Sequence, residues 1–321
     1  MKKILSLVSM VACLGVSPMA VAQTYPTKPV TLTVGFAPGG NADTLARVLA
    51  REMVSGLGKP VQVETKPGAG GNIAAAAVAH AGPDGHTLLL ITGGHAVSGA
   101  LYKSLGYKTL DSFEPIAVVT SFPFMIAAKA ESADTSLGVL LARAKAKPGA
   151  VMFGSAGIGS TQHLTGELLA SMAQTPMTHV PYKGDSAALV ALLGGEVDFI
   201  VAPPAAIMAQ LKAGKVKALA VSGGSRWRAL PEVPTVAESG VAGFDVQSWL
   251  GLATTAGTPR PVVDRLSAEV QRVTQIPAVR TAIESMGSDI TVTSPDETRK
   301  RMAAELQRWT KVIDEARIER Q

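Results

Sequence analysis

The sequence predicts an α/β protein with two lobes, and two observations lead to this prediction. One pattern occurs four times: a short apolar strand, a loop rich in Gly, Ser, Thr, Asn or Lys, and a helix with apolar residues at helical spacing. Two long extended segments without such a loop, residues 113–129 and 244–255, interrupt this rhythm. Alternating strands and helices indicate parallel sheets, and two crossing segments allow the chain to leave a first lobe, build a second and return.

The first residues predict a secretory signal peptide. Lys2 and Lys3 precede an apolar stretch over residues 4–16, and residues 20–22 (Ala-Val-Ala) form a cleavage site. The apolar stretch is too short for a membrane anchor. We therefore expect residues 1–22 to be removed and the mature chain to be a soluble protein of a bacterial periplasm.

The only cysteine, Cys13, falls inside this predicted signal peptide. The exported chain would therefore carry no disulfide and no cysteine metal site. Lipid attachment at Cys13 is an alternative. Simple cleavage is favoured because the apolar stretch before Cys13 is short and a good cleavage site follows it.

Charge and length narrow the classes of function. Lys and Arg number 30 against 25 Asp and Glu, and loss of Lys2 and Lys3 leaves 28 against 25, a net charge of +3. This mild excess, without any basic run, argues against a nucleic-acid partner, whereas weak positive charge helps to attract anions. Residues 23–321 exceed the usual size of one hydrophobic core, which favours two domains.

The four strand–loop–helix units come in pairs. The first pair spans residues 30–53 and 61–79, and the second pair spans residues 151–169 and 179–195, between the two crossing segments. The expected domains are a first lobe from residues 23–121, a second lobe from residues 122–246, and a return crossing with C-terminal helices, residues 247–321, on the first lobe.

Helical spacing continues in the tail, over residues 258–286 and 294–316. Ser294 and Glu297 form a capping box around Pro295, which is a strong signal for a helix start. We assign these helices no chemistry and expect them to pack on the first lobe.

The loops of the four units favour an anion. The first N–H groups of a helix have no partner within the helix, and the aligned peptide dipoles add partial positive charge there. Helix starts lie at the carboxyl ends of parallel strands, so two loops from each lobe would converge on one cleft. The donors expected from the first three loops are Gly39, Gly40 and Asn41; Gly70, Gly71 and Asn72; and Ser155, Gly157, Gly159, Ser160 and Thr161.

A simpler interpretation of these loops stays open. Glycines after strands are common in α/β proteins because they supply turns with positive φ and close packing. In that interpretation Asp43 and Thr44 cap the first helix, and Asp185 and Ser186 cap the fourth. Four such loops in one chain, two of them with paired glycines, favour the anion site.

Signs of catalysis, metals and nucleotides are absent from the sequence. The five histidines lack metal-ligand spacing, and neither a Gly-x-Ser-x-Gly elbow nor a P-loop occurs. The glycines around residues 68–71 and 157–159 lack the third glycine of the dinucleotide fingerprint. We therefore expect the protein to bind no cofactor and no metal and not to be an enzyme. A serine triad formed by residues that are distant in the sequence stays an alternative.

Two further polar residues are candidates for ligand contact. His163 follows the third loop and is expected to be a hydrogen-bonding loop residue that could donate to a bound carboxylate. Asp198 follows a glycine pair and could orient a loop or meet the ligand, although a cap or turn role is favoured.

An ordered set of segments carries a resemblance to a known family. The segments are GFAPGGNAD (35–43), PGAGGNIAAAAVA (67–79), FGSAGIGSTQHL (153–164), HVPYKG (179–184), LPEVPTVAESG (230–240) and WLGLATTAGTP (249–259). Each alone is weak, but in this order they cover essentially the whole mature chain. The sequence thus resembles the Bug (TctC) family of tripartite tricarboxylate transporter receptors.

The resemblance implies a periplasmic solute-binding protein with two α/β lobes that close like a Venus flytrap of type II-like architecture. It implies that one carboxylate is held by the first two loops, largely through backbone and ordered water, and that the Gly-Ser loop and the PYKG region meet the rest of the ligand. The contacts implied for this sequence are Phe36, Ala37, Gly39, Gly40, Asp43, Gly70, Gly71, Asn72, Ser155, Gly157, Ser160, Thr161, His163 and Tyr182.

Two departures from the family pattern bear on the ligand. Family members that bind amino acids often place an aspartate after the VDF-like segment, where this sequence has Ala202 and Pro203. This favours a mono- or dicarboxylate without an ammonium group. Residues 93–102 also differ from the family's segment, so the resemblance implies no ligand contacts from that region.

The function expected from the sequence is capture of a small organic carboxylate for uptake through the membrane components of a tripartite tricarboxylate-type transporter, by a monomer. A periplasmic sensor that presents its liganded form to a signalling receptor is the first alternative. A secreted serine hydrolase is the second.

Overall fold

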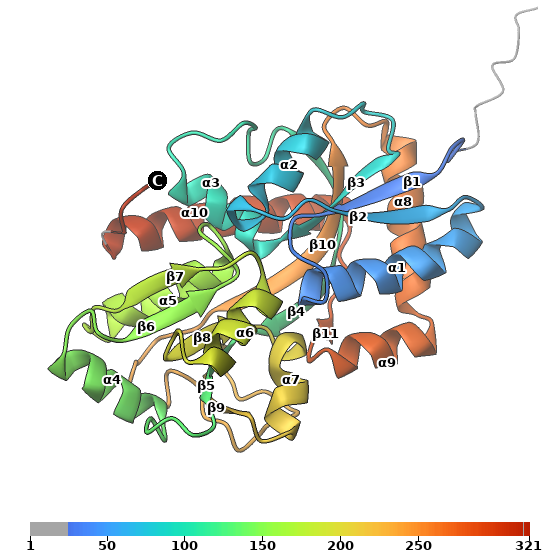
Figure 1. The fold of residues 1–321 in the computed structure, drawn as a ribbon. Helices are drawn as coiled ribbons and strands as arrows, with labels where there is room; N and C mark the ends of the chain where they lie inside the picture. Colours follow the sequence, from blue (N-terminus) through green and yellow to red (C-terminus); the bar gives the residue numbers. More distant parts are fainter. Residues whose placement is uncertain (1–24, 317) are drawn as a thin grey trace, which may run out of the picture.

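Two β-sheets, each flanked by helices, organise the chain in the computed structural model, which describes residues 25–316 and 318–321 (Figure 1). The predicted signal peptide, residues 1–22, lies outside the described residues. The strands of the first sheet are β1 (Val30–Val34), β2 (Val61–Thr65), β3 (Thr87–Thr92), β4 (Phe113–Pro123), β10 (Gln247–Thr255) and β11 (Asp289–Ile290). Those of the second are β5 (Met125–Lys129), β6 (Met152–Ser155), β7 (Thr178–Pro181), β8 (Phe199–Ala202) and β9 (Val216–Val221).

The helices fall into two groups along the chain. Those of the first lobe are α1 (Asn41–Leu57), η1 (Ala69–Gly71), α2 (Asn72–Ala79), α3 (Gly93–Leu101), α8 (Arg260–Thr274), α9 (Pro277–Ser285) and α10 (Pro295–Glu315). Those of the second lobe are α4 (Leu137–Ala146), α5 (Thr161–Met172), α6 (Asp185–Gly194) and α7 (Pro204–Lys212). All four predicted strand–loop–helix units are present, and the expected two-lobed α/β fold is confirmed.

Both sheets are mixed rather than purely parallel, which corrects the sequence prediction. The first sheet has the order β11-β4-β10-β3-β1-β2, and β1 pairs in parallel with β2 and β3. The second has the order β7-β6-β8-β5-β9, with β6 parallel to β7 and β8. The crossing strands β10 and β5 run antiparallel to their neighbours because they carry the chain between the sheets without a crossover helix.

The first crossing is direct. Strand β4 ends at Pro123 in the first sheet and β5 begins at Met125 in the second. The residue between them, Phe124, is buried, and its ring meets Phe122 edge-to-face at 5.7 Å. The chain returns after Val221 and re-enters the first sheet at Gln247, so the buried apolar core continues from lobe to lobe through these segments.

The C-terminal helices pack on the first lobe, where α10 lies alongside α3 (Figure 1). The expected helix over residues 258–286 is divided into α8 and α9, because Pro277 cannot continue the hydrogen-bond ladder of α8 and instead begins a new helix. The predicted capping box of Ser294 and Glu297 begins α10. Within the described residues, no helix combines the length and the apolar character needed to cross a membrane.

Candidate functional site

The glycine-rich loops of the two lobes meet each other, as predicted. In the loop before α1, a Cβ added to Gly39 would lie 3.5 Å from Ser186 Oγ of the second lobe. In the loop before α6, a Cβ on Gly184 would lie 3.3 Å from the backbone nitrogen of Ala37. The first and fourth loops therefore lie against each other across the lobe boundary.

The second and third loops form a similar contact. Gly70 has φ +63°, and a Cβ on it would collide with the carbonyl oxygen of Ile158 and lie 3.0 Å from the backbone nitrogen of Ser160. Gly157 has φ +126°, and its Cβ position is 3.4 Å from the Gly70 nitrogen. These backbones approach each other only because neither residue has a side chain.

A cavity of about 30 Å³ lies where the loops converge. Three of the residues that line it, Asn41, Thr161 and Asp185, are the first residues of α1, α5 and α6, and Thr92 is the N-cap of α3. The complete lining is Phe36, Asn41, Ala42, Thr92, Phe122, Phe124, Thr161, Gln162, Asp185, Pro203, Ser248 and Leu250. Four helix starts from both lobes thus surround one space, which favours negative charge there.

Neutral hydrogen-bonding groups gather around Gly93 beside this cavity. A Cβ on Gly93 would lie 3.0 Å from Ser248 Oγ, 3.2 Å from Thr161 Oγ1 and 3.4 Å from Trp249 Nε1. The buried Trp249 N–H has no hydrogen-bond partner among the described residues, and neither polar atom of the Asn41 side chain has one. Unpaired buried polar groups are costly, so these groups are well suited to receive a ligand.

Asp185 is the titratable residue in the cavity lining. Its Oδ1 accepts a hydrogen bond from Gln162 Nε2 at 2.9 Å. Burial raises its pKa to about 6, although this hydrogen bond and the nearby backbone N–H of Asn41 act in the opposite direction. The sequence interpretation assigned Asp185 only a capping role.

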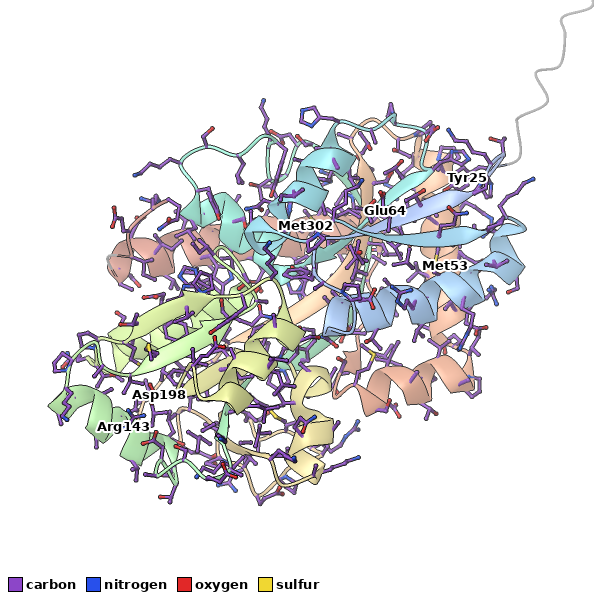
Figure 2. The ribbon with its side chains drawn as sticks, in the orientation of Figure 1. Tyr25, Met53, Glu64, Arg143, Asp198 and Met302 are labelled. Carbon is purple, nitrogen blue, oxygen red and sulfur yellow. The ribbon has the colours of Figure 1, made fainter. Side chains whose placement is uncertain are left out.

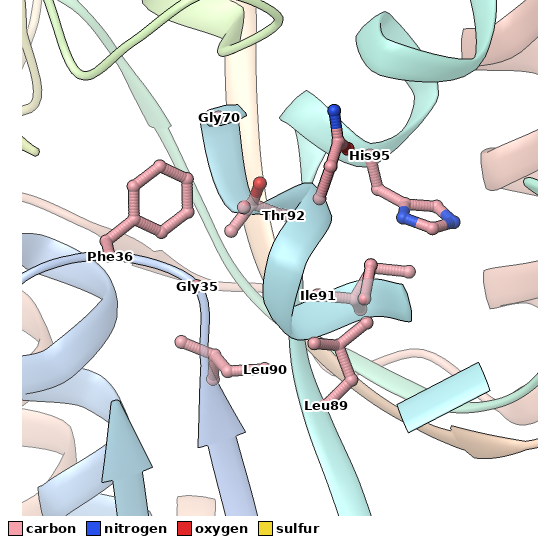
Figure 3. Close-up of a pocket in the computed structure, with 11 residues that line it drawn as sticks. Gly35, Phe36, Gly70, Leu89, Leu90, Ile91, Thr92 and His95 are labelled. Atoms are coloured by element: carbon pink, nitrogen blue, oxygen red, sulfur yellow. The ribbon is translucent and has the colours of Figure 1, made fainter. Parts of the chain in front are cut away.

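A second cavity, of about 20 Å³, lies behind the Gly70 loop in the first lobe (Figure 3). Phe36 lines both cavities, while Gly70, Gly71 and Asn72 line this one. The Asn72 side chain accepts a hydrogen bond from the Tyr107 hydroxyl at 2.7 Å, so its amide is oriented from within the first lobe.

Three predicted contact residues form hydrogen bonds that shape their own loops. Asp43 Oδ2 accepts the Gly39 N–H at 3.0 Å and pairs with Arg47. Ser155 Oγ accepts the Gly157 N–H at 3.1 Å. Ser160 is the N-cap of α5, and its hydroxyl also donates to the Gly157 carbonyl at 2.7 Å. These residues fix the loops, and ligand contact from them stays a prediction.

The structure places three other predicted residues away from both cavities. The Tyr182 hydroxyl donates to Glu196 at 3.2 Å. On the second lobe, the Asp198 carboxylate accepts a hydrogen bond from the Arg143 guanidinium at 2.8 Å (Figure 2) and another from the Met152 N–H at 2.7 Å. These bonds agree with the structural role that the sequence analysis favoured for Asp198.

His163, the third of these residues, lines a separate, larger cavity of about 620 Å³ beside the C-terminal tail. It forms a cluster with Glu167 and His179 that the sequence spacing did not reveal. His163 Nδ1 accepts the Gly159 N–H at 3.4 Å, so the proton of the neutral ring lies on Nε2, 3.7 Å from Glu167. A metal ligand would need that nitrogen deprotonated, and the cluster is therefore better suited to hydrogen bonding than to a metal.

Several residues of the interlobe cavity were not predicted as contacts from the sequence. They are Ala42, Thr92, Phe122, Phe124, Gln162, Asp185, Pro203, Ser248 and Leu250. Gln162 and Asp185 stand at helix starts directly after predicted loops, a position that could have identified them. Ser248 lies on the return strand β10, where its pairing with Phe122 of β4 brings it to the site.

Comparison with known proteins gives a consistent result. The sequence profile described as "Tripartite tricarboxylate transporter family receptor" (TctC) matches residues 45–318. A protein of Pseudomonas sp. (strain P51), "UPF0065 protein in tcbD-tcbE intergenic region", is 36% identical over 295 residues, covering 92% of this chain and 88% of that protein.

Two solved structures are similar over nearly the whole described chain. The structure of periplasmic binding protein BugD has a TM-score of 0.88 and 35% identity, covering 92% of this chain and 100% of that one. MatC from Rhodopseudomonas palustris, solved with bound malate, has a TM-score of 0.87 and 34% identity, covering 90% of this chain and 100% of that one.

Proposed function

The chain belongs to the family of tripartite tricarboxylate transporter receptors, and from this premise we propose that it is a periplasmic solute-binding protein. It captures a small organic carboxylate between its lobes and delivers it to the membrane components of a tripartite tricarboxylate-type transporter. It acts as a monomer and makes or breaks no covalent bond.

The observation that carries this proposal is the cavity shared by the two lobes. Four helix starts surround it, and the hydroxyls of Thr161 and Ser248 and the Trp249 N–H lie together at one side of it. Neutral donors in a buried site hold a carboxylate without an ion pair, which suits reversible capture. The malate in the related MatC is a ligand of this chemical kind.

The size of the cavity indicates how the ligand enters. A volume of about 30 Å³ accommodates roughly two water molecules, fewer atoms than a small organic acid contains. The lobes therefore separate to admit the ligand and close around it. Binding favours closure only by the difference in ligand affinity between the closed and open forms.

Calorimetry with the purified protein and a panel of organic carboxylates, malate included, tests this proposal. Thr161→Val and Ser248→Ala should each weaken the affinity by about tenfold, because each removes a donor to a charged group. Ser285→Ala, which removes an exposed hydroxyl on α9, is the matched control and should change nothing. A panel in which no carboxylate binds would overturn the proposal.

A hydrolase is the alternative that the same protein sample tests. Ser155 Oγ lies 2.7 Å from His179 Nε2, a distance that a nucleophile and its base would show. Ser155 is completely buried, however, and its hydroxyl is held by the Gly157 backbone. We therefore expect no turnover of ester or amide substrates, and turnover lost in Ser155→Ala would contradict the binding-protein assignment.

A further inference from the structure

The titratable side chain of the interlobe cavity is an acid, which is unexpected for a site that binds an anion. Among its lining residues, Asp185 is the one with a titratable side chain, and that side chain carries a carboxylate. The residue is only 8% exposed. A second carboxylate brought into the same buried space by a ligand would be repelled, because like charges at short range disfavour each other's ionised forms.

The hydrogen bonds of Asp185 leave it able to accept another donor. Its side-chain partner, Gln162 Nε2, is neutral, as is the nearby Asn41 N–H, and no ion pair among the described residues includes it. A carboxylate has about four acceptor sites, so acceptor capacity remains beside the cavity. The adjacent Asn41 side chain, also without a partner, can complete the recognition of a polar group.

The other polar groups of the cavity have the opposite character. Thr161, Ser248 and Trp249 gather around Gly93, and they offer hydroxyl and N–H donors with no formal charge. Phe36, Phe122, Phe124, Pro203 and Leu250 supply apolar walls. The site therefore has a donor group for an anion, an apolar lining, and a separate acceptor group at Asp185.

We infer that Asp185 determines the ligand class of this site. Resting on the proposed function, the inference is that the ligand carries one carboxylate, a short apolar body, and a hydrogen-bond donor, such as a hydroxyl or ammonium group, that Asp185 accepts. A dicarboxylate is disfavoured at neutral pH. This revises the expectation from the sequence, which included dicarboxylates and favoured a ligand without an ammonium group.

A matched ligand series tests the inference directly. At each of about four to six carbons, the series contains the plain monocarboxylate, its ω-hydroxy and ω-amino derivatives, and the dicarboxylate, for example butyrate, 4-hydroxybutyrate, 4-aminobutyrate and succinate. Calorimetry at about pH 7.5 should show a donor-bearing ligand binding about tenfold or more tighter than the dicarboxylate of the same length.

The variant Asp185→Asn keeps the shape of the side chain and removes its charge. It should tighten dicarboxylate binding by about tenfold and weaken binding of the ω-amino ligand by a similar factor, so that the order of preference reverses. Thr161→Val is the matched control, because it should weaken every carboxylate alike and leave the order unchanged.

The outcomes separate this inference from the proposed function. Carboxylate binding by the native protein with the dicarboxylate preferred, or an unchanged order in Asp185→Asn, overturns the role of Asp185 while the proposed function stands. Failure of every carboxylate to bind overturns both. A reversed order in Asp185→Asn, with none in Thr161→Val, supports the inference.

Discussion

Asn41, the first residue of α1 in the first lobe, and Asp185, the first residue of α6 in the second lobe, line the same cavity, and the backbone N–H of Asn41 lowers the pKa of the Asp185 carboxyl. A carboxylate at a helix N-terminus is stabilised by the free N–H groups and the helix dipole. Burial nevertheless raises the pKa of Asp185 to about 6, so desolvation outweighs this stabilisation. Burial of Asp185 between the lobes thus disfavours its ionised form, although the Asn41 N–H acts in the opposite direction.

The first prediction concerns stability against pH. The native state holds the Asp185 proton more tightly than the unfolded chain does. Ionisation of Asp185 therefore lowers the free energy of unfolding as pH rises from 3.8, its ordinary pKa, to about 6, and the loss is complete above about pH 6. Asp185→Asn should therefore raise the free energy of unfolding by roughly 1 to 3 kcal/mol at about pH 7.5. Urea denaturation of both proteins across this range measures the difference.

The gap between the Asp185→Asn variant and the native protein should shrink toward about pH 4, where the native carboxyl is protonated. Comparing the two proteins cancels the titration of the other acidic residues. A gap of the same size at every pH would contradict the burial of an ionisable Asp185.

The second prediction concerns closure. Gly70→Ala places a methyl group against the backbone of Ile158 in the opposite lobe, so it should oppose closure and weaken ligand binding by about tenfold or more. Gly58→Ala is a matched control, because Gly58 has φ +68°, close to the +63° of Gly70, and open space around its Cβ position. Calorimetry with the tightest carboxylate measures both variants.

Both glycine variants should lose about 1 kcal/mol of stability, because an L-residue adopts these backbone angles at a cost. A loss of affinity in Gly70→Ala alone identifies the contact between lobes as its cause. If both variants bind the ligand as the native protein does, the lobes do not close through the Gly70 contact.

The fold was predictable where its determinants are local. Apolar periodicity predicted the units that contain β1 and α1, and β6 and α5. This was possible because the spacing of apolar residues in a strand or helix depends only on residues close in the sequence. The meeting of the loops was also predictable, since parallel strands present their carboxyl ends at one edge of a sheet. The direction of the crossing strands depends on the whole sheet, and it was missed.

The candidate site was only partly predictable because its chemistry depends on contacts between lobes. Asp185 at a helix start has the sequence pattern of a capping residue, and only the packing of the first lobe against it shows that it is buried beside a cavity. Ser248 carries no local signal at all. His163, which has the right type and position, turns toward Glu167 instead.

The third prediction concerns the start of α10. The Ser294 hydroxyl accepts the Glu297 N–H while the Glu297 carboxylate accepts the Ser294 N–H, so Ser294→Ala should cost about 1 kcal/mol or more of stability. Ser136, the N-cap of α4, accepts a single hydrogen bond, from the Val139 N–H, and provides the comparison. Thermal denaturation should show a smaller loss of stability for Ser136→Ala than for Ser294→Ala. Equal losses would mean that the second hydrogen bond of the Ser294 cap contributes no stability.

The fourth prediction concerns Asp198, for which the sequence favoured a structural role but also allowed contact with the ligand. Arg143 donates to Asp134 at 3.1 and 2.6 Å and to Asp198 at 2.8 Å. The Asp134 side chain is only 3% exposed, whereas that of Asp198 is 26% exposed. Removing the cation would leave Asp134 as an unpaired buried charge, which is the costlier loss.

Arg143→Met should therefore lower the free energy of unfolding by about 2 to 4 kcal/mol, and Asp198→Asn by about 1 kcal/mol or less. Neither variant should change carboxylate affinity, because Asp198 lies beside Arg143 and Met152 and lines neither cavity. Denaturation and calorimetry on the same samples test both statements. Carboxylate binding that weakens in Asp198→Asn, without a matching loss of stability, would place Asp198 back among the ligand contacts.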